Sequence, residues 1–136
     1  MKVAFATQDG AHIDAHFGWA KNIAIYDVLP GSSSFVKTIE FSGTMGEDGN
    51  EDKLGPKLEA IDDCAMLYVA AIGGSGAARV VAKGIHPVKV AETETIENIL
   101  LRLREVLSGN PPPWLRKVLN KGRERTLDFE DEVAHA

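Results

Sequence analysis

The sequence of 136 residues contains one cysteine, Cys64, and this scarcity excludes two kinds of site. A single thiol cannot form an internal disulfide, and it cannot supply an all-thiolate site for zinc or for an iron–sulfur cluster. A bound metal would need histidine, carboxylate or ligands that the metal group itself brings. Because Cys64 precedes an apolar, strand-like segment, we interpret it as an inert core thiol rather than a nucleophile.

Positive charge and long apolar runs are also scarce. The net charge of −5 argues against nonspecific binding to nucleic acid or anionic membranes, because both need a strong positive field. The longest apolar run, residues 66–72, is far shorter than the roughly 20 residues that cross a bilayer. The N-terminus lacks the apolar stretch of a secretory signal. We therefore expect a soluble, cytoplasmic protein that binds no nucleic acid and no membrane.

The first third of the sequence is rich in strand-forming residues. An unbroken apolar run at residues 3–6 is typical of a central strand buried on both faces. Residues 23–29 and 35–41 are rich in β-branched and aromatic side chains, and the Pro-Gly-Ser-Ser stretch between them indicates a turn. These three strands are predicted to form an antiparallel meander.

Strands and helices alternate in the rest of the sequence. Further strands are predicted at residues 66–72 and 88–90, with helices starting near Pro56, after residues 73–76, and over residues 96–107. Strand–helix–strand units make their strands parallel neighbours. The order therefore predicts an α/β protein with a mixed five-stranded sheet flanked by helices, and a ribonuclease H-like three-layer fold fits it.

The sequence divides into three parts of different composition. Residues 1–110 are expected to form the α/β domain, and residues 111–122 a proline-rich spacer followed by a short helix. Trp114 favours docking of that helix, because so large a side chain is rarely left exposed, and its apolar face would include Leu115, Val118 and Leu119. Residues 123–136 are acidic and expected to be disordered.

The densest group of possible metal ligands lies in the loop after the first strand. Side chains alternate along an extended chain, so His12, Asp14 and His16 would project to one side and face one spot. Imidazole nitrogen is a good ligand for iron and zinc. His12 and His16 are thus candidate metal ligands. The residues alone leave another interpretation open, in which His16 only hydrogen-bonds its own loop and Phe17 fills the core.

A second candidate site is the run Gly73-Gly74-Ser75-Gly76 at the start of a predicted helix. Unpaired N–H groups and the positive end of the helix dipole favour an anion there. The run lacks the Gly-Lys-Ser/Thr of a phosphate-binding P-loop. It has some likeness to a dinucleotide loop, although Arg79 stands where a third glycine would be expected. A plain tight turn also fits.

Catalysis has little support in this sequence. A nuclease with a ribonuclease H-like fold needs several carboxylates at strand ends to hold two metal ions, yet residues 66–72 contain none. We therefore expect a binding protein and not an enzyme. Four cations could line the same edge of the sheet as the His16 loop, although ordinary solvated surface fits them equally; they are Lys53, Lys57, Arg79 and Lys83.

Several short motifs give the sequence a specific family likeness. They occupy residues 2–7, 14–20, 51–54, 70–74, 84–90 and 109–115. The most specific are the His-Phe-Gly element at 16–18 and the Asn-Pro-Pro-Pro-Trp-Leu run at 110–115. In these motifs the sequence resembles the NifX/NafY family of nitrogenase iron–molybdenum cofactor biosynthesis proteins, over residues 1 to about 122.

The resemblance implies a ribonuclease H-like fold and a carrier or store for iron–sulfur precursors of the cofactor. In the family these precursors pass from NifB toward the NifEN scaffold, and the histidine of the His-Phe-Gly element, here His16, is implicated in cofactor binding. A preassembled anionic cluster brings its own sulfides, so a carrier needs one or two exchangeable ligands plus N–H groups or cations. The expected cofactor-binding residues are His16, Phe17, Gly18, Gly73, Gly74, Ser75, Gly76 and Arg79. A nucleotide-binding regulatory module that uses residues 73–76, or an interaction protein without ligand, remain the alternatives.

Overall fold

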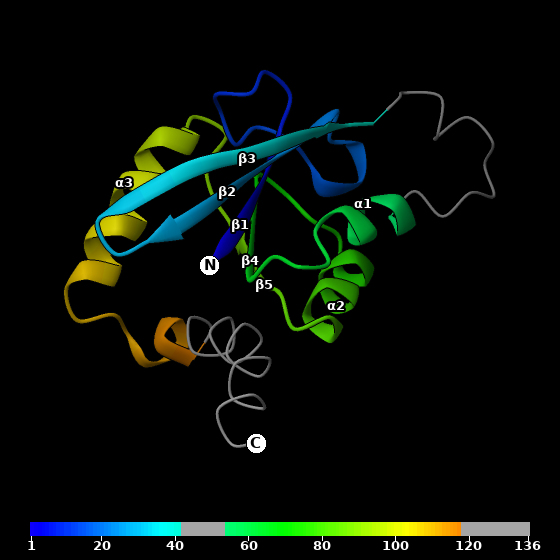
Figure 1. Cartoon of the computed structure of the whole chain (residues 1–136). Coiled ribbons are helices and arrows are strands. Elements are labelled where there is room, and N and C mark those ends of the chain that lie inside the picture. The colour runs from blue at the N-terminus through cyan, green and yellow to red at the C-terminus, as the bar shows by residue number, and fades with distance from the viewer. Residues whose placement is uncertain (42–53, 118–136) are drawn as a thin grey trace, which may run out of the picture.

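A mixed five-stranded sheet forms the centre of the protein, in the order β3-β2-β1-β4-β5 (Figure 1). The structure is a computed structural model, and it describes residues 1–41 and 54–117. Strands β1 (Lys2–Thr7), β2 (Asn22–Leu29) and β3 (Ser32–Glu40) pair antiparallel in sequence order. The predicted meander is therefore confirmed. Gly31 makes the turn between β2 and β3 with a φ of 79°, a backbone conformation that glycine adopts without strain.

The second part of the sheet is parallel. Strands β4 (Met66–Val69) and β5 (His86–Lys89) run in the same direction as β1. Strand β5 begins two residues before the predicted strand and includes Pro87. Proline is tolerated there because β5 is the edge strand, where one side makes no ladder hydrogen bonds. Strand β4 covers only the first part of the apolar run at 66–72, because the run then pairs with a loop.

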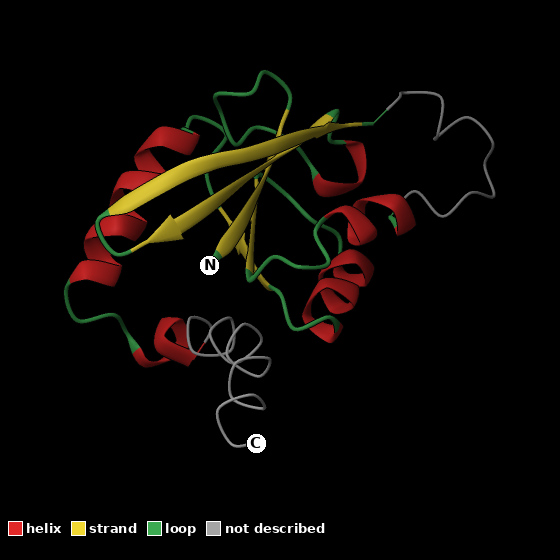
Figure 2. Cartoon of the chain, in the orientation of Figure 1, coloured by secondary structure: helices red, strands yellow, loops and turns green. Residues whose placement is uncertain are grey.

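Helices lie on both faces of the sheet (Figure 2). Helices α1 (Gly55–Ala60) and α2 (Gly74–Ala82) cover one face, and α3 (Ile96–Ser108) covers the other. Helix α1 begins as predicted, with Pro56 in its first turn. Helix α3 covers the predicted residues 96–107, and its buried side chains lie on one face: Ile96, Ile99, Leu100, Leu103 and Leu107. The predicted mixed five-stranded α/β sheet flanked by helices is confirmed.

Strand β1 supplies both halves of the core. Ala4 and Ala6 face α1 and α2, whereas Val3 and Phe5 face α3, and all four are fully buried. The Phe5 ring stacks on Tyr68 of β4 with ring centroids 5.3 Å apart. A continuous apolar strand is required here because neither face of β1 meets water.

The segment after α3 docks on the sheet. Residues 113–117 are helical, so Pro113 belongs to the first helical turn rather than to an extended spacer. Leu115 is only 2% exposed and joins the core on the α3 side. The Trp114 ring stacks on the ring of His86 in β5, with centroids 4.6 Å apart. Val118, Leu119 and the acidic residues 123–136 lie outside the described residues.

Within the described part of the chain, no helix combines the length and the apolar character that crossing a membrane requires.

Replacing Leu115 by alanine tests how much this docking stabilises the domain. Deleting a fully buried leucine side chain leaves a cavity, so we expect Leu115→Ala to lower the free energy of unfolding by about 2–5 kcal/mol. Leu101→Ala is the matched control, because Leu101 is 45% exposed on α3 and should change stability by less than about 0.5 kcal/mol. Urea unfolding followed by circular dichroism measures both. Equal losses in the two variants would contradict the docking of residues 113–117.

Candidate functional site

In the loop between β1 and β2, the side chains from His12 to Phe17 alternate between solvent and core. Ile13, Ala15 and Phe17 are fully buried, whereas the side chains of His12, Asp14 and His16 are on the opposite side of the loop and are partly or fully exposed. Alternation of this kind follows from extended backbone geometry. The predicted alternation is therefore confirmed, and His16 is exposed to solvent.

Backbone hydrogen bonds join this loop to the chain that follows β4. Phe17 N–H donates to the Ala71 carbonyl at 2.9 Å, and Ala70 N–H donates to the Ala15 carbonyl at 3.0 Å. His16 and Ala71 form a parallel bridge. Since Gly73 begins two residues after Ala71, the two glycine-containing elements singled out in the sequence are neighbours in space.

His16 begins a short 3₁₀ turn, η1 (Phe17–Trp19), and caps it. The Gly18 N–H donates to the imidazole Nδ1 at 3.2 Å. The Phe17 side chain is fully buried in the core on the α1 and α2 side, and this burial holds the turn against the sheet. Because it is buried, the Phe17 side chain cannot contact a ligand at the surface. Of the predicted residues in this turn, His16 is therefore the one whose side chain is exposed to an incoming group.

The predicted glycine turn is the start of helix α2. Gly73 is the N-cap, and Gly74, Ser75 and Gly76 are already helical. Gly73, Gly74 and Ser75 are exposed, and Arg79 is exposed one turn further along. The first N–H groups of a helix have no intrahelical acceptor and carry partial positive charge. This arrangement can stabilise an anion beside the His16 turn.

Leu54 links the two elements by packing against both. A Cβ added to Gly76 would lie 3.4 Å from Leu54 Cδ1, and one added to Gly18 would lie 3.8 Å from Leu54 Cδ2. Gly76 is buried, so it lies beneath the surface that Gly73, Gly74 and Ser75 form. Leu54 thus packs between the His16 turn and the first turn of α2.

Lys57 is one of the four cations for which the sequence left two interpretations open, a place beside the His16 loop or an ordinary solvated surface. The structure buries it to 4% exposure, and its Nζ donates to the Gly18 carbonyl at 2.8 Å. Lys83, by contrast, pairs with Asp62 at the surface at 3.0 Å, and Lys53 lies outside the described residues. A sequence signal existed, since Lys57 occupies the i+3 position of the apolar stripe that starts at Leu54.

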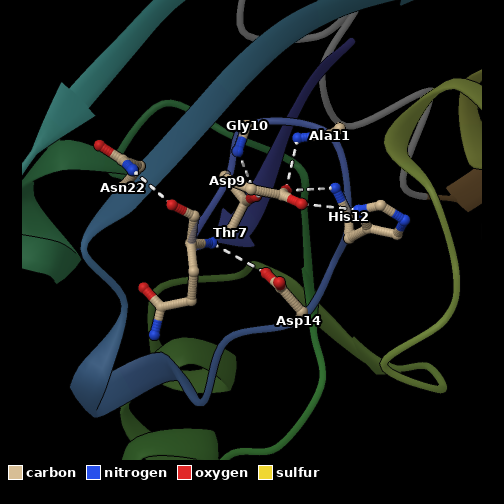
Figure 3. A network of polar contacts seen from close by, with 8 residues as sticks. Thr7, Asp9, Gly10, Ala11, His12, Asp14 and Asn22 are labelled. Atoms are coloured by element: carbon tan, nitrogen blue, oxygen red, sulfur yellow. Dashed lines mark hydrogen bonds and ion pairs between the residues drawn. The ribbon is translucent and has the colours of Figure 1, made fainter.

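His12 belongs to a different network (Figure 3). The Asp9 carboxylate accepts the backbone N–H groups of Ala11 and His12, both at 2.8 Å, and contacts the His12 ring at 2.7 Å. The backbone hydrogen bonds from His12 and Ala11, followed by that of the His12 ring, hold the pKa of the Asp9 carboxyl well below its usual range. Asp14 instead accepts the backbone N–H of Gln8 at 2.8 Å.

The expectation that His12, Asp14 and His16 face one spot is wrong. Over residues 1–41 and 54–117, no group of three or more histidine, cysteine or acidic side chains is placed to hold a metal ion. The reason is that the two ends of the loop pair with different segments. His12 bridges to Thr95 before α3, whereas His16 bridges to Ala71 after β4. A metal group at His16 would need ligands from beyond this triplet.

Sequence comparison identifies the family of this chain. The family model described as dinitrogenase iron–molybdenum cofactor matches residues 1–106, and the chain belongs to this family.

Within the family, the chain is similar to proteins named NifX. It is 63% identical to NifX of Herbaspirillum seropedicae over 133 residues, which cover 98% of this chain and 91% of that protein. It is 41% identical to NifX of Rhodobacter capsulatus over 138 residues, covering 97% and 87%. It is also 30% identical to the FeMo cofactor biosynthesis protein NifB of Bradyrhizobium diazoefficiens, covering 82% of this chain but 25% of that protein.

Among solved structures, the crystal structure of PH0822 has a similar fold. The TM-score is 0.51 at 19% sequence identity, and the match covers 65% of this chain and 76% of that one. At this identity the likeness concerns the fold alone.

The Asp9 network predicts a pH dependence of stability. A carboxyl whose pKa is lower in the folded than in the unfolded state stabilises the fold above its unfolded pKa, and this contribution is lost as the pH falls through the folded pKa. We expect wild type to lose stability below about pH 4 and Asp9→Asn to lose less, because asparagine has no carboxyl to protonate. Urea unfolding at pH 7 and pH 3 measures the difference. Asp62→Asn is the surface control, and equal losses in wild type and Asp9→Asn would reject the assignment.

Alanine at two positions of the first turn of α2 tests the packing around Leu54. Gly74→Ala places its Cβ in open space, and the better helix propensity of alanine should leave the protein at least as stable as wild type. Gly76→Ala would put a Cβ 3.3 Å from Ile72 Cγ1, which must then shift together with Leu54. Thermal unfolding should therefore rank Gly76→Ala below Gly74→Ala. The opposite ranking would show that the side chains of Ile72 and Leu54 move away from the added Cβ at little cost in stability.

Proposed function

We propose that the protein carries or stores iron–sulfur precursors of the nitrogenase iron–molybdenum cofactor, and that it acts in cofactor biosynthesis as a binding protein rather than an enzyme. Membership of the dinitrogenase iron–molybdenum cofactor family and the similarity to NifX and NifB support this role. The observation that carries the proposal is the exposed imidazole of His16, which stands on a fixed turn beside the first residues of α2.

The chemistry of these two elements suits an anionic cluster. An imidazole nitrogen can form one reversible bond to iron, and the cluster supplies the remaining ligands as its own sulfides. The N–H groups at the start of α2 and the positive end of its dipole would stabilise the negative charge. Arg79, exposed one turn further along α2, adds a cation on the same helix.

Weak protein ligation fits a cargo that must be handed on. Cys64 is fully buried, and burial together with Asp63 raises the pKa of its thiol to about 12, so this cysteine does not offer a thiolate. A carrier that holds a cluster through one imidazole and several hydrogen bonds can release it to a stronger site. We infer that NifB is the source of the cluster and that a NifEN-type scaffold is the recipient. The similarity to part of NifB supports the first of these partners.

We also infer that the fold is ribonuclease H-like. The strand order β3-β2-β1-β4-β5, with an antiparallel meander followed by two strands parallel to β1, supports this layout. The carboxylates that a nuclease with such a fold would need are absent from β4. The layout therefore provides a scaffold for binding and gives no support to nuclease chemistry.

Removing the His16 imidazole tests the proposal. We expect His16→Ala to retain much less iron than wild type after anaerobic incubation with the cluster that NifB produces, because the reversible bond to the cluster is lost. Iron counting and electronic spectra after desalting measure retention, and circular dichroism verifies the fold.

The matched control is His12→Ala. Its ring contacts the Asp9 carboxylate and belongs to the end of the loop that pairs with Thr95. We expect this variant to retain iron as wild type does. Equal retention by wild type and His16→Ala would refute a role of His16 in binding, and a loss in His12→Ala alone would transfer that role to His12.

A further inference from the structure

We propose that Lys57 is the positioning residue for His16: its buried ammonium group holds the Gly18 carbonyl and thereby fixes the turn that orients the imidazole. The effect on ligand affinity rests on the function proposed above. The effect on the His16 ring does not, because it is a property of the protein without ligand.

The burial of Lys57 is unusual for its position. Lysine is almost never fully buried unless its charge is satisfied, and helix α1 places Lys57 between Leu54 and Leu58 on the face that covers the sheet. An apolar residue would pack at such a position without the desolvation of an ammonium group. Retaining a charge there indicates that the charge has a task other than packing.

Two contacts of the Lys57 ammonium group indicate such a task. Its Nζ donates to the Gly18 carbonyl at 2.8 Å, although the two residues are 39 positions apart in the sequence. The same Nζ lies 5.2 Å from the centroid of the Phe41 ring, a distance at which cation–π attraction stabilises the ammonium. Lys57 thus joins helix α1 to the turn that carries His16.

Gly18 passes this restraint to the imidazole. While its carbonyl accepts from Lys57, its N–H donates to His16 Nδ1 at 3.2 Å. A Cβ on Gly18 would lie 3.7 Å from Nδ1, so the ring packs directly against this residue. The orientation of the Gly18 backbone and that of the ring are therefore coupled, and Lys57 fixes the first of them.

The geometry also indicates which nitrogen of the His16 imidazole carries the hydrogen when the ring is neutral. Because Nδ1 accepts a hydrogen bond, the hydrogen of the neutral imidazole is on Nε2. The hydrogen bond from Gly18 thus fixes the tautomer and the orientation of the ring in the protein without ligand. Iron bonds to a ring nitrogen that has a free lone pair, so ligation through either nitrogen requires the Gly18 hydrogen bond to break. By fixing Gly18, Lys57 keeps the bond from His16 to iron weak, as a carrier that releases its cargo requires. Loss of the Lys57 contact should release Gly18 and let the ring adopt both tautomers.

The experiment compares Lys57→Met with Lys83→Met. Methionine keeps an unbranched apolar chain at position 57 and removes the donor, whereas Lys83 is a surface lysine of α2's C-terminus paired with Asp62. Nitrogen-15 spectra of the His16 ring, recorded without ligand at a pH where the imidazole is neutral, should show the Nε2–H form in wild type and Lys83→Met. In Lys57→Met they should show a mixture of the two tautomers.

The second measurement is affinity for the cluster that NifB produces, under anaerobic conditions. Lys57→Met should bind it about twofold to tenfold more tightly than wild type, because ligation no longer has to break a fixed Gly18 hydrogen bond, and one hydrogen bond contributes about this much. Lys57→Arg keeps a cationic donor and should return both the ring signature and the affinity toward those of wild type. Its recovery would separate positioning from a general loss of packing.

Two results would overturn the proposal: an unchanged His16 ring spectrum in Lys57→Met, or a changed spectrum with unchanged or weaker binding. If Lys57→Met does not fold, Lys57→Arg decides through the same two measurements, with wild-type-like or partial recovery supporting the proposal and none overturning it. If wild type itself binds no cluster, the function proposed above fails, and the ring spectrum of the ligand-free variants still decides the role of Lys57.

Discussion

The pairing of the His16 loop with the chain after β4 is the interaction on which the rest of the site depends. Two backbone hydrogen bonds, from Phe17 to Ala71 and from Ala70 to Ala15, hold the loop as if it continued the sheet. This pairing buries alternate side chains and exposes the others, so it directs His16 outward. It also sets the turn beside the first residues of α2. An exposed imidazole and a helix N-terminus become one surface because of these bonds.

The turn that carries His16 is held rigidly, but it offers few groups that could bind a metal cluster. Phe17 is sealed in the core beneath the turn, Leu54 packs between the turn and α2, and Lys57 reaches the turn from α1. Binding groups held by such supports lose little freedom when a ligand arrives. At the same time the exposed ligand-type group is a single imidazole rather than a set of thiolates. Firm placement with few bonds suits the proposed role, in which the protein accepts a cluster and releases it again.

The comparisons and the geometry answer different questions. The family match over residues 1–106 defines what kind of protein this is, and the high identity to NifX covers almost the whole chain. The likeness to PH0822, at 19% identity, reaches only to the fold. None of these describes how the surface around His16 is assembled. That description comes from the contacts of His16, Gly18 and Lys57, which join three separate stretches of sequence.

The sequence alone determined the order and type of the elements, the burial of β1, the meander and the alternation from Ile13 to Phe17, because each follows from local periodicity and turn composition. Only the tertiary structure decided which segments meet. It separated His12 from His16 by pairing them with Thr95 and Ala71. It also buried Lys57 beside the His16 turn, a choice that the sequence had left open. Local patterns record which face of an element is apolar. They do not record which carbonyl lies opposite a charge once distant elements pack together.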